Sequence, residues 1–300
     1  MPTTLTPDIR ITLPGGKNYG DVLRVVDTRG LHTVCQSARC PNMAQCWNER
    51  TATFMLLGNI CTRACRFCAV QHGKPRELDL AEPDRVAEAV HALRLDYAVI
   101  TSVNRDDLPD GGAFLFAETV RCIRALRPEC LIELLVPDFC GDLNALDIVL
   151  RAQPDVLNHN VETVPRLYRT IQPWSKWDDS LAVLRHAAGR GFVAKSGIIA
   201  GLGETREEMF EAIRAVRETG CSILTVGQYL APTPRHAPVQ RVVSPEEFKE
   251  YETFALELGF AAVLSGPLVR SSYRAKWAYE HARRRIPVSS PTGQSPRVSL

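Results

Sequence analysis

The sequence predicts an α/β protein built around a mainly parallel sheet. From Phe54 onward, short apolar segments alternate with amphipathic segments of about ten to fifteen residues, which is the pattern of successive strand and helix units. Seven apolar segments follow one another in this way, a number that fits a partial or complete barrel of β/α units. The chain has 300 residues, enough to bury the core of one barrel-sized domain.

The bounds of each expected element are set where the hydrophobic pattern changes. Strands are expected at residues 54–59, 97–102, 131–137, 156–160, 193–199, 223–229 and 261–265. Helices are expected between them, at residues 82–94, 113–127, 142–152, 178–190, 205–219 and 245–258. A last helix is expected at 275–285, and residues 286–300 have the Ser- and Pro-rich composition of a disordered tail.

Residues 1–53 precede this alternation and show no sustained periodicity, so we expect an extension that a metal site must fix in place. The formal net charge of +2 argues against a nucleic-acid partner. No apolar run reaches the roughly 18 residues of a membrane span. The first residues carry neither an apolar signal core nor an Arg-rich amphipathic face, so a cytoplasmic location is expected.

Six of the ten cysteines form two triplets. The first triplet is Cys35, Cys40 and Cys46, spaced C-x4-C-x5-C, and the second triplet is Cys61, Cys65 and Cys68, spaced C-x3-C-x2-C. In a chain of this length without an export signal, thiolate ligation is favoured over disulfides, and both spacings suit iron–sulfur clusters. Zinc is the alternative, but it is usually held by two close pairs of cysteines, which neither triplet supplies. The remaining four, Cys122, Cys130, Cys140 and Cys221, stand alone among apolar neighbours and are expected to be buried thiols.

The second triplet directly follows the first expected strand, at the strand end where β/α barrels build their active sites. Three thiolates can hold three irons of a [4Fe–4S] cube and leave the fourth iron open to a small molecule. Phe67 lies within the triplet and is expected to shield the cluster from solvent.

The pattern C-x3-C-x-Phe-C after a first barrel strand resembles the radical S-adenosylmethionine (SAM) superfamily. The resemblance implies a [4Fe–4S] cluster whose open iron binds the amino and carboxylate groups of SAM. Reduction of that cluster would split SAM and release a 5′-deoxyadenosyl radical. Such a radical takes hydrogen from an unactivated carbon, chemistry that a protein must borrow from a cofactor.

Two glycine-containing segments agree with this resemblance. Gly111 and Gly112 follow the second expected strand, where the superfamily has a turn that meets the methionine amino group. The alternative is a plain turn before a helix. Gly201 and Glu204 fit G-x-I-x-G-x-x-E, a segment that lies near the adenine in the superfamily, although Glu204 could serve only as a charge at a helix N-terminus.

The end of the fourth expected strand carries polar groups at the same rim. Asn160 and Glu162 are expected to bind the ribose hydroxyls of SAM. His159, between Asn158 and Asn160, is expected to be a hydrogen-bonded structural histidine.

The two triplets together with R-S-S-Y-x-A at residues 270–275 are similar to the lipoyl synthase family. Residues 101–112, 195–198 and 226–230 also look like blocks of that family. In the family, the N-terminal triplet binds an auxiliary [4Fe–4S] cluster that a serine of the terminal motif completes, which implies this role for Ser272, with Ser271 as the less favoured candidate. From the residues alone, either serine is most simply an N-cap of the last helix.

The resemblance implies insertion of two sulfur atoms, at C6 and C8 of an octanoyl chain linked to a carrier-protein lysine, with the auxiliary cluster as sulfur donor. Implied partners are E2 lipoyl domains and the glycine cleavage H protein as octanoylated carriers, a reductant such as ferredoxin or flavodoxin, and a carrier that rebuilds the cluster. The implied fold is a partial (β/α)6-type TIM barrel at residues 54–266. It would lie between an extension with the auxiliary cluster, 1–53, and a C-terminal part, 267–300, that holds the motif, a helix and the tail.

Other function classes fit part of this pattern. A biotin synthase is not expected to carry the first triplet or R-S-S-Y, and a methylthiotransferase should add a C-terminal β domain that binds RNA. A non-enzymatic iron–sulfur carrier would need neither a barrel nor glycine-rich turns that fit SAM.

Overall fold

The computed structural model of the protein describes residues 13–75 and 78–285. Its centre is an eight-stranded sheet in the order β1-β2-β5-β6-β7-β8-β9-β10. From β2 onward, each strand pairs in parallel with the next. These parallel strands are β2 (Thr53–Leu56), β5 (Tyr97–Ser102), β6 (Leu131–Leu135), β7 (Val156–Asn158), β8 (Val193–Ala200), β9 (Ile223–Gln228) and β10 (Ala262–Gly266). β1 (His32–Thr33) is antiparallel to β2. The tail expected at 286–300 lies outside the described residues.

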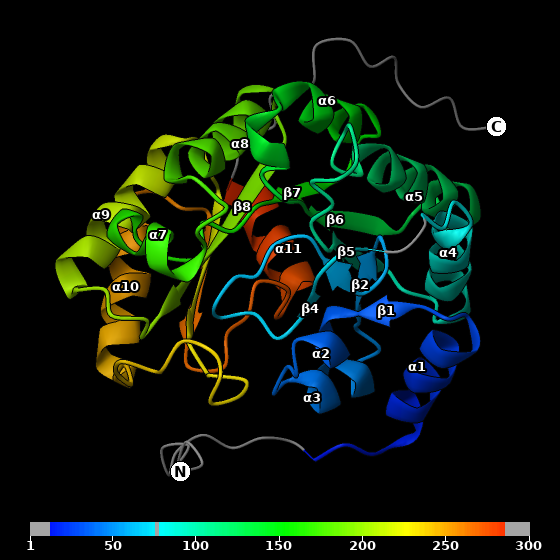
Figure 1. The fold of residues 1–300 in the computed structure, drawn as a ribbon, viewed down its shortest axis with the longest axis horizontal. Helices are drawn as coiled ribbons and strands as arrows, with labels where there is room; N and C mark the ends of the chain where they lie inside the picture. The colour runs from blue at the N-terminus through cyan, green and yellow to red at the C-terminus, as the bar shows by residue number, and fades with distance from the viewer. Residues whose placement is uncertain (1–12, 76–77, 286–300) are drawn as a thin grey trace.

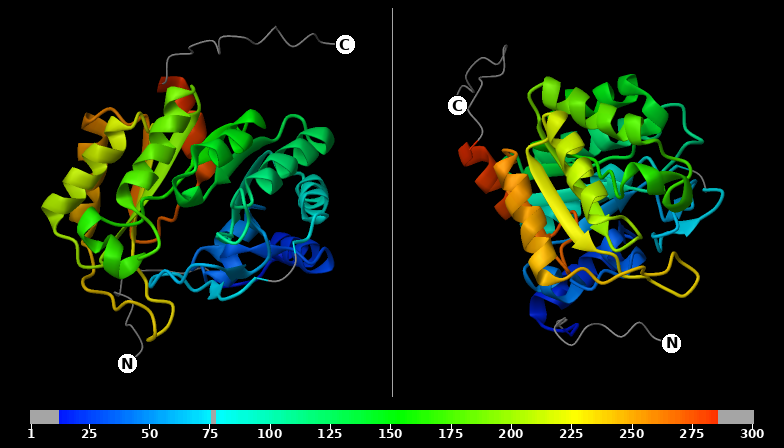
Figure 2. Two further views of the ribbon diagram at one scale, coloured as in Figure 1. Left: turned by 45° about the horizontal axis from the view of Figure 1, so that its top comes forward. Right: turned by 90° about the vertical axis from the view of Figure 1, so that its left-hand side faces the viewer.

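The prediction of an α/β fold with a mainly parallel sheet is confirmed. All six expected internal helices are present, as α4 (Glu82–Ala92), α5 (Ala113–Leu126), α6 (Leu143–Arg151), α8 (Trp177–Gly189), α9 (Arg206–Glu218) and α10 (Pro245–Glu257). They form an outer arc around the strands (Figure 1; Figure 2 gives two further views). Within the described part of the chain, the sheet is open, with β1 and β10 at its two edges.

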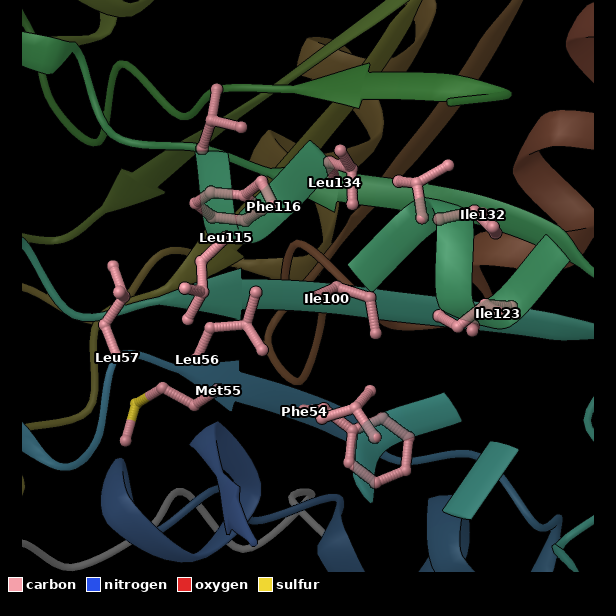
Figure 3. Packing of buried hydrophobic residues seen from close by; sticks show 14 of the residues in the cluster. Phe54, Met55, Leu56, Leu57, Ile100, Leu115, Phe116, Ile123, Ile132 and Leu134 are labelled. Atoms are coloured by element: carbon pink, nitrogen blue, oxygen red, sulfur yellow. The ribbon is translucent and has the colours of Figure 1, made fainter. Parts of the chain in front are cut away.

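The packing of strands on helices explains why the strands could be predicted. Phe54, Ile100 and Leu134 come from three neighbouring strands, Phe116 and Ile123 come from α5, and none of these side chains has exposed area (Figure 3). Burial of each contributes about 1.5–3 kcal/mol. Parallel strands covered by helices are apolar throughout, so they read as continuous apolar runs.

The first strand is shorter than expected and ends at Leu56 instead of residue 59. The chain turns there because Leu57 and Gly58 adopt positive φ angles of 69° and 83°. The Leu57 amide donates to Oε2 of Glu82 at 2.6 Å, which holds the turn. This turn takes the chain off the sheet before Cys61.

The last helix, α11 (Ala275–Arg285), has the predicted bounds and covers the amino ends of the strands. It forms a small apolar core with residues at or near the starts of strands: Tyr97, Val99, Val156, Val193, Ile223 and Ala262 pack with Ala275, Ala278, Tyr279 and Ala282 of α11. With that end closed, the carboxyl ends of the strands face the other side of the molecule.

The expectation that the extension lacks periodicity is wrong for residues 17–28, which form helix α1 (Lys17–Thr28). Apolar residues at Tyr19, Val22, Leu23 and Val26 have the spacing of one helix face, a signal that the sequence analysis missed. Two short helices follow, α2 (Val34–Ser37) and α3 (Met43–Asn48).

Apolar contacts hold this extension on the sheet. Trp47 of α3 is fully buried, belongs to the same core as Phe54, and lies 5.1 Å from the ring of Tyr19, measured between centroids. The extension is therefore held by the apolar core that it shares with the sheet. None of the helices in 13–75 and 78–285 is long and apolar enough to cross a membrane.

Replacing Trp47 with Ala should destabilise the protein by about 3–5 kcal/mol, because a large buried side chain would leave a cavity under the extension. Denaturant unfolding of the reduced, cluster-free protein measures this loss. Trp277→Ala is the matched control, since Trp277 is 40% exposed on α11, and it should leave the midpoint nearly unchanged. Equal midpoints for the two variants would contradict the packing described for the extension.

Candidate active site

A cavity of about 1190 Å³ opens at the carboxyl ends of the parallel strands. Its walls come from the loops after β2, β5, β6, β7 and β9, from the extension, and from residues 269–272 near the end of the described chain. Ligand pockets usually measure about 300–1,000 Å³, so this cavity has room for more than one ligand.

All three cysteines of the second triplet line the cavity. Burial, with further contributions from neighbouring thiols and Glu162, raises the pKa of Cys65 to about 12 and that of Cys68 to about 11. The sulfur of Cys61 accepts hydrogen bonds from the backbone amides of Arg63, at 3.4 Å, and Asn104, at 3.3 Å. Buried thiols with such high pKa values bind as thiolates only next to strong positive charge, which iron ions supply.

The loop that carries the second triplet is fixed by Arg63, whose side chain is almost fully buried. Its guanidinium bonds to both carboxylate oxygens of Asp138, at 2.7 and 2.8 Å, and of Asp106, at 2.8 and 2.9 Å. Burial works to lower the pKa of Arg63, but these carboxylates outweigh it and raise that pKa. The arginine therefore joins the cysteine loop to the loops after β5 and β6.

The second triplet is also held from the side of β9. His236 donates from Nε2 to the carbonyl of Cys68 at 3.0 Å, while its Nδ1 accepts from the Thr233 hydroxyl at 2.8 Å. The Ala237 amide donates to the carbonyl of Arg66 at 2.8 Å. This strap after β9, residues 230–236, lines the cavity beside the cysteine loop.

Asn160 and Glu162 both line the cavity, as the sequence predicts for this rim. Nδ2 of Asn160 donates to Oε1 of Glu162 at 3.1 Å. Burial raises the pKa of Glu162 to about 7, against the effect of this hydrogen bond. The imidazole of His159 has one hydrogen bond, from Nδ1 to the Val136 carbonyl at 2.9 Å, and its Nε2 has no partner among the described residues.

Phe67 lines the cavity and packs against the apolar core around β8 and β9. Gly111 and Gly112 do not line the cavity. Their φ angles are 60° and 87°, and a Cβ on Gly112 would collide with Leu57, so the turn before α5 requires glycine for its own packing.

Gly201 and Glu204 also lie outside the cavity lining. Both carboxylate oxygens of buried Glu204 accept backbone hydrogen bonds, from Gly201 at 2.6 Å and from Leu202 at 2.9 Å. Glu204 thereby shapes the turn between β8 and α9. The cavity is instead reached by Gly197, Ile198 and Ile199 of β8 itself.

The first triplet lies in and around α2 and α3, with Cys35 and Cys40 lining the same cavity. Burial, followed by the neighbouring thiols of Cys35 and Cys40, raises the pKa of Cys46 to about 12. Cysteines of both triplets therefore line one cavity, although Cys46 is not part of its lining.

The C-terminal segment meets the extension beside the first triplet. Nδ2 of Asn42 donates to the carbonyl of Leu268 at 2.6 Å, and Arg270 is close enough to Cys40 to affect its pKa. Ser271 and Ser272 both line the cavity. Ser271 bonds to side chains of the β7 region, 113 and 111 residues away, and not to an amide of α11, so it is no N-cap.

The sequence analysis missed Arg63, Asn104 and the strap after β9. The signal for Arg63 was available in part, since two arginines, Arg63 and Arg66, lie inside the cysteine loop, and Asp106 and Asp138 both follow strands whose ends share one rim. The strap carried no periodic pattern from which its position could be read.

The prediction of four buried isolated thiols is correct for Cys130 and Cys221 and wrong for Cys140, which is exposed. Cys140 lies in the tight turn after β6, where its sulfur accepts from Arg63 at 3.2 Å. Cys122 is half-buried on α5 and donates to Asp84 at 3.3 Å.

Known proteins resemble this chain in sequence and in fold. Residues 55–216 match the Radical SAM superfamily. A lipoyl synthase from Chloroflexus aggregans is 55% identical over 269 residues, which are 89% of this chain and 88% of the relative. A lipoyl synthase from Rubrobacter xylanophilus is 54% identical over 278 residues, 92% of this chain and 87% of the relative.

The chain belongs to the lipoyl synthase family.

Lipoyl synthases are radical SAM enzymes that act as sulfurtransferases and use SAM and [4Fe–4S] clusters. Solved structures share the fold at low identity. HydG, a maturase of the [FeFe]-hydrogenase, aligns with a TM-score of 0.56 at 13% identity over 89% of this chain and 67% of its own. SuiB of Streptococcus suis bound to SAM aligns with a TM-score of 0.55 at 9% identity over 84% of this chain and 56% of its own.

Replacing Arg63 with Met should destabilise this lipoyl synthase family member by about 3–5 kcal/mol, because buried Asp138 would lose its counter-ion. Arg166→Met is the matched control, since Arg166 makes a similar two-pronged contact with Glu208 at the surface. Surface pairs contribute little, so the control should unfold at nearly the wild-type denaturant concentration. If both variants unfold alike, the buried arginine does not organise the cysteine loop.

Proposed function

We propose that this chain inserts two sulfur atoms at C6 and C8 of an octanoyl group carried on a protein lysine, giving a lipoyl group. The observation that carries the proposal is one cavity that is lined by the whole second triplet, by Cys35 and Cys40 of the first triplet, and by the C-terminal serines. One triplet alone would suit any radical SAM enzyme, whereas two triplets allow one cluster to start the reaction and another to supply sulfur. The relatives named lipoyl synthase support this division.

The second triplet would hold the cluster that cleaves SAM. When bound, this cluster supplies the electron that generates a carbon radical for hydrogen abstraction. Asn160 and Glu162 would bind the ribose of SAM, and Phe67 would keep water from the cluster. Gly111, Gly112, Gly201 and Glu204 would act on SAM only through the turns that they shape, because they lie outside the cavity lining.

The first triplet and Ser272 would hold the auxiliary cluster that donates sulfur. Among the described residues no three of these side chains are close enough to hold a single metal ion. The chemistry of the donors supports the assignment, since Cys35, Cys40 and Ser272 line one cavity and thiolates are the usual ligands of such clusters. The Ser272 hydroxyl has no hydrogen bond to any residue in 13–75 or 78–285, so it is available as a ligand. Oxygen binds iron less strongly than thiolate in such sites, and a weakly held iron suits a cluster that is consumed.

The residues of the chain also position the octanoyl substrate. Met55, Leu135 and Ile198 line the cavity and offer apolar surface to a saturated chain. A radical reacts with whatever lies nearest, so the chain must be held in contact with it and kept from water.

The domain division follows from these roles. The six β/α units from β2 to α10, within residues 54–266, would form a partial (β/α)6 barrel. Residues 1–53 would bring the auxiliary cluster, and residues 267–300 would bring the serine ligand and the helix that closes the amino end.

The partners proposed from the family are octanoylated E2 lipoyl domains and glycine cleavage H protein, a ferredoxin or flavodoxin as reductant, and an iron–sulfur carrier that rebuilds the spent cluster. All ten cysteines are unpaired, which suits a reducing compartment such as the cytoplasm.

The activity is tested by incubating the reconstituted protein without oxygen with SAM, a strong reductant and an octanoyl-lysine peptide, and by weighing the peptide by mass spectrometry. A product with two sulfurs in place of two hydrogens is expected. If 5′-deoxyadenosine forms but no peptide gains sulfur, the assignment as a radical SAM enzyme stands and the proposed substrate is refuted.

Single replacements should separate the two clusters. Cys65→Ala should abolish SAM cleavage, whereas Cys40→Ala should retain SAM cleavage and lose sulfur transfer. Cys130→Ala, a buried cysteine outside the cavity, is the control for general damage and should retain both activities. Loss of SAM cleavage in the Cys40 variant would contradict separate tasks for the two triplets.

A further inference from the structure

Ser271 connects the C-terminal segment to the inside of the sheet. Its Oγ accepts a hydrogen bond from Nδ2 of Asn158 at 2.8 Å and donates one to Oδ1 of Asn160 at 2.9 Å. Both asparagines come from β7 and the residues that follow it. The hydroxyl of Ser271 thus both donates and accepts a hydrogen bond. The hydroxyl of its neighbour Ser272 has no hydrogen-bond partner among residues 13–75 and 78–285.

A buried carboxylate on the neighbouring strand sets the orientation of Asn158. Glu133 of β6 has no exposed side-chain area, and its Oε1 accepts from Asn158 at 2.8 Å and from Nζ of Lys195 at 2.8 Å. The Tyr97 hydroxyl donates to Oε2 at 2.6 Å. Because a carboxylate only accepts, the amide nitrogen of Asn158 must face it, and the second N–H of that nitrogen points to Ser271.

Two further contacts hold the same segment from other sides. A Cβ on Gly227 of β9 would overlap the backbone carbonyl of Val269, so this segment lies directly on the glycine backbone. On the opposite side, Asn42 of the extension donates to the carbonyl of Leu268. Residues 267–272, here called the serine loop, are therefore held between β7, β9 and the extension.

We propose that Ser271 is a positioning residue that seats the serine loop, through Asn158 and the Glu133–Lys195 pair, so that Ser272 faces the first triplet. This inference rests on the proposed function, in which Ser272 is the ligand of the auxiliary cluster. An oxygen–iron bond is too weak and too labile to set the geometry of its own loop. The hydrogen bonds of Ser271 keep the ligand in place while the cluster is consumed and rebuilt.

The test uses the full-length chain with Cys61, Cys65 and Cys68 replaced by Ala, so that only the auxiliary cluster is present. After reconstitution with ⁵⁷Fe, the iron content per chain and the Mössbauer spectrum report the cluster, and an iron bound by oxygen differs in its spectrum from irons bound only by sulfur. Ser271→Ala and Asn158→Ala are compared with Ser265→Ala. Ser265 is the matched control, because its hydroxyl donates to the Phe248 carbonyl outside this network.

Loss of two ordinary hydrogen bonds should shift the ratio of seated to released serine loop by roughly tenfold. The spectrum of Ser271→Ala should therefore lose most of its oxygen-bound iron while three cysteines retain the cluster, and Asn158→Ala should behave alike. Ser265→Ala should match the parent protein. An unchanged oxygen-bound iron in Ser271→Ala would overturn the proposal.

Ser272→Ala separates this inference from the proposed function. It should remove the oxygen-bound iron completely. If Ser272→Ala alone removes it, the ligand assignment stands and the positioning role of Ser271 is refuted. If only Ser271→Ala removes it, Ser271 is the ligand itself, which refutes both the positioning role and the assignment of Ser272.

Gly227→Ala provides a variant that retains every hydroxyl and amide of the network. The added methyl group would push the Val269 carbonyl and with it the serine loop. It should reduce the oxygen-bound iron as Ser271→Ala does. It therefore tests the proposal even if the Ser271→Ala protein folds poorly. A folded Gly227→Ala protein with the parent spectrum would overturn the claim that loop position controls the ligand.

Discussion

A carboxylate with no access to solvent lies inside the sheet, and much of the site is arranged around it. Glu133 receives hydrogen bonds from Lys195, Tyr97 and Asn158, so side chains from β5, β6, β7 and β8 converge on one charge. A buried charge left without partners would cost several kcal/mol, and removal of either member of such a pair is strongly destabilising. These strands can therefore pack only with this set of polar groups in register.

The polar chain continues from this carboxylate toward the cavity. Asn158 donates a hydrogen bond to Ser271, Ser271 donates one to Asn160, and Asn160 donates one to Glu162. Glu162 lies beside the second triplet. One line of hydrogen bonds thus runs from the middle of the sheet, past the serine loop, to the rim where SAM would bind. Cysteines of both triplets line one cavity because Asn42 joins the extension to the serine loop, and the asparagines of the β7 region join the serine loop to this rim.

Local patterns in the sequence were sufficient for the sheet and its helices. The segment 97–102 matches β5 at both ends, and 275–285 matches α11, because buried strands and amphipathic helices each leave a periodic pattern. The spacing of the cysteines likewise predicted two neighbouring ligand sets. Helix α1 was not predicted although Tyr19, Val22, Leu23 and Val26 carry its period, because it has no capping side chain at its start and contains a glycine in its second turn.

Contacts between distant segments could not be predicted in the same way. Ser271 and Asn158 are 113 residues apart, and no periodicity relates them. The sequence suggested helix capping for the C-terminal serines because capping depends on neighbours alone. Similarly, the apolar neighbours of Cys140 suggested burial, whereas the turn after β6 brings the thiol to the surface.

The central claim is that one cavity holds two clusters and that the serine loop supplies a ligand to one of them. A crystal structure of the anaerobically reconstituted protein, with iron located by anomalous scattering, tests it most directly. We predict one cluster on the second triplet and another on the first triplet, with Ser272 bound to iron and Ser271 still between Asn158 and Asn160. A single cluster, or an auxiliary cluster with Ser272 turned away from it, would contradict the account.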